Sequence, residues 1–239
     1  MKSKVAMLAL GFLLVSVSTA QAQFWEKKDW KTWSEAECKK MLEDSPWGVK
    51  YVTARVEQPT IGAPTGGTGR VTEQQIGYSA HLRSALPVRQ AIIRLAMIQN
   101  KYDKMTPEQK AAFDKQAEEY VNRSFEDRIV IHVNYWTNLP GIERELANLW
   151  QSVRPDAIPV NIYLMGRKGT RIHPARFVSP PGSAMEFEVI FPRIVDGQPI
   201  VDETTKNLML ELPGVGFGEE RLLLQFKAEK MKFKGEQVY

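Results

Sequence analysis

The sequence contains only one cysteine, Cys38, so the chain cannot form an internal disulfide bond. Cys38 lies at an apolar position of an expected helix, which is typical of a buried thiol rather than a reactive one. An excess of charge of one sign is also missing, because 32 basic residues stand against 28 acidic ones. A balance this even argues against a nucleic-acid-binding protein, and we expect no nucleic-acid partner.

The motifs of several common enzyme classes are absent as well. The sequence has no G-x-S-x-G for a serine hydrolase and no H-E-x-x-H for a zinc protease. A glycine-rich run at 62–70 lacks the Gly-Lys-Ser/Thr of a phosphate-binding loop and precedes a strand pattern, so we interpret it as a surface loop. We therefore expect no cofactor and no bound metal.

The only long apolar run lies at the N-terminus. Residues 5–17 follow Lys2 and Lys4 and precede the small residues Ala20 and Ala22, which is the pattern of a cleavable secretory signal. Thirteen residues are fewer than the roughly 20 that a membrane-spanning helix needs. The sequence thus predicts a signal peptide at 1–22, a periplasmic or secreted protein, and no integral membrane segment after cleavage.

Residues 23–239 are enough for one ample domain. We expect a single domain, with a possible subdivision near 154–159, where prolines bracket a change of composition. Helix signals dominate before that point, and strand signals dominate after it.

Two capping boxes mark helices in the N-terminal half. Ser34 is followed by Glu37, and Thr106 is followed by Pro107 and Gln109, so helices are predicted to begin at these positions. The first should end near 44–46, where a proline follows. Further helices are expected from Pro87 and over 141–153, giving three to four in this half.

Strands are expected at 49–56, 76–82 and 128–136, where apolar and polar residues alternate or β-branched residues gather. Beyond residue 158 the candidates are 160–165, 171–178, 185–191, 207–212 and 221–233, joined by glycine- and proline-containing turns. The sequence therefore predicts an α+β fold with a mostly antiparallel β-sheet and a β-rich C-terminal half.

The candidate binding residues are four tryptophans that gather around the first helix. Exposed indoles can stack on sugars or anchor a partner, whereas buried ones would clamp this helix onto the sheet. Both interpretations remain open at this stage for Trp25, Trp30, Trp33 and Trp47.

Polar residues on the strands are the other candidates. His81, His132 and His173 lie on separate expected strands, so only folding could bring them together around a metal ion. Two of them near one point, beside a carboxylate, would favour a metal enzyme. Glu186 and Glu188 share one face of a strand, which is typical of a solvated face but would also place two carboxylates together.

The N-terminal segment resembles a known family. Residues 29–37, with the pattern W-x-x-W-S-x-x-E, run into a helix that stops at Ser45-Pro46-Trp47. This signature is similar to that of secreted bacterial proteins of the acidobacterial type, for which no activity is known. The resemblance implies export and a shared fold, but it implies no catalytic residue.

Together these observations favour an exported, non-enzymatic domain that binds an envelope ligand or a partner protein whose identity the sequence does not give. The alternative is a hydrolase of envelope polymers whose carboxylates or histidines are assembled only by folding.

Overall fold

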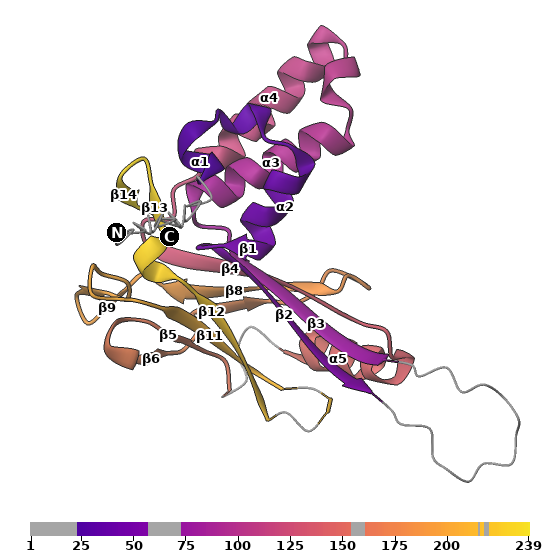
Figure 1. Ribbon diagram of the computed structural model, residues 1–239, viewed down its shortest axis with the longest axis vertical. Coiled ribbons are helices and arrows are strands. Elements are labelled where there is room, and N and C mark those ends of the chain that lie inside the picture. The colour runs from indigo at the N-terminus through magenta and orange to yellow at the C-terminus, as the bar shows by residue number, and fades with distance from the viewer. Residues whose placement is uncertain (1–22, 57–72, 154–160, 215, 218–219) are drawn as a thin grey trace, which may run out of the picture.

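The computed structural model describes residues 23–56, 73–153, 161–214, 216–217 and 220–239. The predicted signal peptide, the glycine-rich run at 62–70 and the candidate boundary at 154–159 lie outside them. Within these ranges the chain forms five α-helices and fourteen strands in antiparallel sheets, which confirms the α+β prediction (Figure 1). None of the helices in the described ranges has the length and apolar character needed to cross a membrane.

The N-terminal helices begin where the capping signals predicted. After the short helix α1 (Phe24–Lys27) and the 3₁₀ turn η1 (Trp30–Thr32), α2 spans Glu35–Glu43. The Ser34 hydroxyl accepts a hydrogen bond from the Glu37 amide, and the Glu37 carboxylate accepts one from the Ser34 amide, so two free donors of the first turn are satisfied. The helix ends at the residue before β1 (Asp44–Ser45).

A six-stranded antiparallel sheet forms the centre of the molecule. Its order is β1-β2-β3-β4-β8-β7, in which β2 and β3 form a long hairpin. The bounds of the remaining strands of this sheet are β2 Gly48–Val56, β3 Glu73–Leu82, β4 Arg128–Thr137, β8 Glu186–Pro192 and β7 Arg176–Val178.

Two long helices project from one end of this sheet as a hairpin (Figure 1). They are α3 (Leu86–Gln99) and α4 (Pro107–Val121), joined through the 3₁₀ turn η2 (Tyr102–Lys104). The Thr106 capping box is formed as predicted. Only Ala117 and Val121 of α4 are buried, so the buried packing of this helix is confined to its C-terminal turns. The shorter α5 (Pro140–Ser152) follows β4.

The C-terminal half adds a second, four-stranded sheet in the order β12-β11-β5-β6. The prediction of one strand over 171–178 is wrong, because the segment divides between β6 of this sheet and β7 of the central sheet. The prediction over 221–233 is likewise wrong, because a 3₁₀ turn interrupts it. The bounds are β5 Tyr163–Met165, η3 Arg167–Gly169, β6 Arg171–Ile172, β9 Ile194–Val195, β10 Gln198–Pro199, β11 Leu208–Pro213, β12 Arg221–Phe226, η4 Ala228–Lys230, β13 Lys232–Phe233 and β14 Glu236–Gln237.

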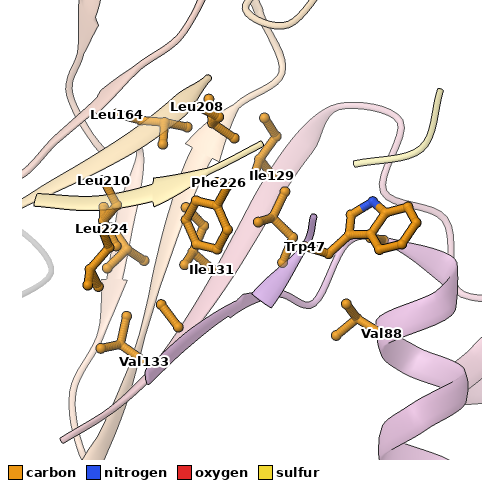
Figure 2. Close-up of a cluster of buried hydrophobic side chains, with 14 of the residues drawn as sticks. Trp47, Val88, Ile129, Ile131, Val133, Leu164, Leu208, Leu210, Leu224 and Phe226 are labelled. Carbon is orange, nitrogen blue, oxygen red and sulfur yellow. The ribbon is translucent and has the colours of Figure 1, made fainter. Parts of the chain in front are cut away.

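The core fills the space between the two sheets. Figure 2 shows Ile131 and Val133 of β4 facing Leu210, Leu224 and Phe226 of the second sheet. Farther along the same face, α5 inserts Trp150, whose ring stacks on Phe187 with centroids 4.3 Å apart. One side of the central sheet, its inner face, is therefore covered, and alternation sends the intervening residues to the opposite side.

Candidate functional site

The four candidate tryptophans do not form a common surface. Trp33 and Trp47 are fully buried and Trp25 is 7% exposed, whereas Trp30 is half-buried. The Trp25 and Trp47 rings meet edge to face, with centroids 5.7 Å apart. A buried indole cannot stack on a ligand, so the packing interpretation describes Trp25, Trp33 and Trp47 in this conformation. Of the four, Trp30 has the most accessible surface, beside two hollows near α3.

Polar and charged side chains gather instead on the side of the central sheet that faces away from the core, which we call the outer face. The strand register arranges its residues in rows. His81 of β3 pairs with His132 of β4, which pairs with Glu188 of β8. The next row along the strands contains Lys50, Ser79, Asn134 and Glu186, and the one after it contains Val52, Gly77 and Trp136.

His132 lies between the two glutamates that alternation had placed on one face. Its Nε2 is 3.4 Å from Glu186 Oε2, and its Nδ1 is 3.5 Å from Glu188 Oε1. On the other side, the His81 and His132 ring centroids are 5.0 Å apart. Both histidines are buried, while the Glu186 side chain is 41% exposed. Folding thus brings two of the three histidines beside two carboxylates.

His81 and Glu188, at the two ends of this row, differ in their charge at neutral pH. Burial, together with the nearby His132 and Arg83, holds the pKa of His81 well below its usual value. Burial alone would raise the pKa of Glu188, but His132 and the hydrogen bond from Arg83 lower it to about 2. At neutral pH, His81 is therefore neutral and Glu188 is an anion.

Arg83 joins this row to the helical hairpin. It follows directly after β3, and its amide donates to the Val130 carbonyl at 2.7 Å. Its guanidinium donates to Glu188 Oε1 through Nη1 and to the Tyr120 hydroxyl through Nε, the latter at 2.9 Å. The end of α4 is thereby fixed against the outer face.

A buried arginine, Arg89, connects the end of β3 with the end of α4. The Arg89 guanidinium donates to the carbonyls of Ser84 and Val121 and lies 4.9 Å from the Phe125 ring centroid. Because Ser84 follows Arg83 and Val121 follows Tyr120, this single side chain sets the positions of both segments.

A cavity of about 340 Å³ opens at this junction. Three arginines line it, Arg83, Arg123 and Arg128, together with a single acidic residue, Glu188. Glu188 is paired with Arg83, and Arg128 pairs with Asp127 at 2.7 Å in an exposed contact that is worth little in water. Arg123 has no ion-pair partner within the described ranges. The cavity is therefore suited to an anion.

The histidine arrangement does not extend to a metal centre in the described ranges, where no group of three His, Cys, Asp or Glu side chains is placed to hold an ion. His173 lies between β6 and β7, exposed, with its ring 4.8 Å from that of Tyr163. It is not brought to the His81–His132 pair.

Sequence reasoning missed the arginines of the cavity. Arg83 contacts Glu188, which lies 105 positions later in the sequence. Arg123 comes just after the end of α4, and the sequence signals in that region indicated only the helix itself. The one usable signal was alternation, which places Glu188 and His132 on the same side of neighbouring strands.

No protein-family model, curated protein or solved structure matched the chain in the three comparisons.

Proposed function

We propose that the chain is an exported binding domain whose ligand carries an anionic group held in the arginine-lined cavity. The observation that supports this proposal is the positive charge of the cavity, which three arginines and one glutamate line and in which Arg123 has no ion-pair partner within the described ranges. Guanidinium groups bind carboxylates and phosphates through paired, charge-assisted hydrogen bonds. The Ser124 side chain also lines the cavity, and its hydroxyl can donate to such a group.

Export rests on the signal pattern at 1–22 and on the resemblance to secreted proteins. It is tested by expressing the full chain in a bacterium and measuring the N-terminal mass of protein from the periplasm. A mature chain that begins at Gln23 supports the proposal. An intact Met1 on protein that stays in the cytosol contradicts it.

Anion binding is tested with the mature protein by calorimetric titration with pyrophosphate at constant ionic strength. Arg123→Ala removes one guanidinium without breaking an ion pair of the described chain, so it should weaken binding about tenfold while preserving the fold. The matched control is Arg144→Ala, on the exposed surface of α5, which should bind as the wild type does. Equal affinity in all three proteins, or no binding by the wild type, would refute the proposal.

A hydrolase of envelope polymers is the second candidate, and the position of His132 between Glu186 and Glu188 favours it. The carboxylates of Glu186 and Glu188 lie on one face of β8, 3.4 and 3.5 Å from the two ring nitrogens of His132, and glycosidases use such pairs of carboxylates. With a pKa of about 2, Glu188 could act as a base or nucleophile but not as a proton donor. The donor would then be Glu186 or His132.

This candidate predicts that the mature protein releases reducing ends from purified peptidoglycan and that Glu188→Gln abolishes the release. No release by the wild type over a range of pH values would leave the binding domain as the function.

A further inference from the structure

Trp136 stands out on the outer face because it is the large aromatic side chain of the central sheet that is exposed in the described ranges. Its side of β4 points away from the core, and it keeps 36% of its surface accessible. Its cross-strand partner is Gly77 of β3. A Cβ atom added to Gly77 would lie 2.2 Å from Cε2 and Nε1 of the indole, so the ring covers the glycine backbone directly.

The absence of a side chain at Gly77 gives the indole a fixed position. The ring atoms Cε2, Nε1 and Cζ2 lie against the Gly77 backbone of β3, and the accessible part of the residue is its surface away from this contact. Tryptophans that serve packing alone in this chain, such as Trp33 and Trp150, have no accessible surface. We propose that Trp136 is a stacking platform for a sugar ring and that the ligand of the outer face is an acidic oligosaccharide.

The neighbouring row supplies the polar groups that a sugar requires. A sugar ring offers C–H groups on its face, which suit an indole, and hydroxyl groups at its edge, which need hydrogen-bond partners. Asn134 lies two positions before Trp136, on the same side of β4. Its cross-strand partners are Ser79 and Glu186. Lys50 lies beyond Ser79 and is exposed.

The length of the ligand follows from the strand. Trp136 and Arg128 are eight positions apart on β4, which corresponds to about 26 Å at the usual rise of a strand. One sugar cannot contact both, so a chain of several sugars would cross the outer face past Asn134 and the partly exposed Arg83, since His132 is buried. Its acidic groups would meet the arginine-lined cavity. This inference therefore rests on the proposed function and names the class of its ligand.

The test compares four probes by calorimetry: a galacturonate hexamer, a neutral β-1,4-glucose hexamer, a hexaglutamate peptide and pyrophosphate. We expect the wild type to bind the galacturonate hexamer more tightly than pyrophosphate. Trp136→Ala should weaken hexamer binding about fivefold to tenfold, the contribution of an aromatic contact, and leave pyrophosphate binding unchanged. Trp136→Phe, which keeps an aromatic face, should restore most of the loss.

Trp30→Ala is the matched control, because Trp30 is also partly accessible but lies on the helical side of the molecule. It should bind every probe as the wild type does. Near-ultraviolet circular dichroism of each variant, compared with the wild type, shows whether the fold is kept.

Equal hexamer affinity in the wild type and in Trp136→Ala would overturn the platform, while pyrophosphate binding that depends on Arg123 would leave the proposed function standing. Failure of the wild type to bind pyrophosphate and the acidic hexamer would overturn both. Neutral hexamer bound as tightly as the acidic one, or hexaglutamate bound with the same dependence on Trp136, would overturn the acidic oligosaccharide as the ligand.

Discussion

The ion pair between Glu188 and Arg83 makes the stability of this protein depend on pH in a way that one substitution should remove. The pKa of Glu188 is 4.5 in an unstructured chain and about 2 in the folded one. A carboxyl whose pKa is lowered by folding stabilises the folded state above its unfolded pKa, and this stabilisation is lost as the pH falls toward its folded pKa. The full difference corresponds to about 3 kcal/mol, and about 2 kcal/mol of it disappears between pH 7 and pH 3.

Glu188→Gln should abolish this contribution, because the amide has no proton to gain over this range. At pH 7 the variant should lose about 2 to 3 kcal/mol of unfolding free energy, since it leaves the Arg83 guanidinium, 33% exposed, without its carboxylate. At pH 3 the difference between variant and wild type should shrink to about 1 kcal/mol.

Urea unfolding followed by circular dichroism at pH 7, 5, 4 and 3 measures these differences. Glu186→Gln is the matched control, with the same substitution on the same strand face, because its carboxylate is more exposed and has no contact with Arg83. If the curves of wild type and Glu188→Gln against pH run parallel, the ion pair does not contribute as described.

Three further outcomes follow from the packing. Ser34→Ala should lower the unfolding free energy by about 1 kcal/mol through loss of the capping box, measured by urea unfolding, with the exposed Ser183→Ala as an unaffected control. Trp150→Ala should cost about 3 to 5 kcal/mol, because it leaves a cavity beside the stacked rings of Phe177 and Phe187 on the inner face; a thermal transition near that of the wild type would contradict this. Burial raises the pKa of Cys38 to about 11, so a disulfide reagent at pH 8 should label it only when urea unfolds the chain, and rapid labelling of the folded protein would show that the thiol is accessible.

Local signals predicted the elements that depend on neighbouring residues. The capping boxes at Ser34 and Thr106 gave correct helix starts, because their hydrogen bonds join residues only three positions apart. Alternation in β4 separated His132 and Trp136 from the core residues Ile131 and Val133, because opposite faces of a strand follow from its geometry.

The candidate site depends on strand order, which no local signal carries. Glu188 meets His132 and Arg83 because β8, besides pairing with the nearby β7, also pairs with β4, more than 50 positions earlier in the chain. The cluster of tryptophans left a binding role and a packing role both open, because sequence spacing does not distinguish an exposed indole from one packed against a distant segment. Trp47 illustrates this, since its Nε1 donates to the carbonyl of Val238, 191 positions away.

The two ends of the helical hairpin formed by α3 and α4 should differ in local stability. At its far end the helices are tied by exposed contacts, such as the Tyr102 hydroxyl donating to Asp114, whereas its near end is fixed by the buried Arg89. Amide hydrogens in the first turns of α4 should therefore exchange with solvent through local opening, well below the cost of global unfolding, while those near Val121 exchange only when the whole molecule unfolds. Local opening at the far end of the hairpin would therefore not move its near end, where Tyr120 contacts Arg83 of the outer face.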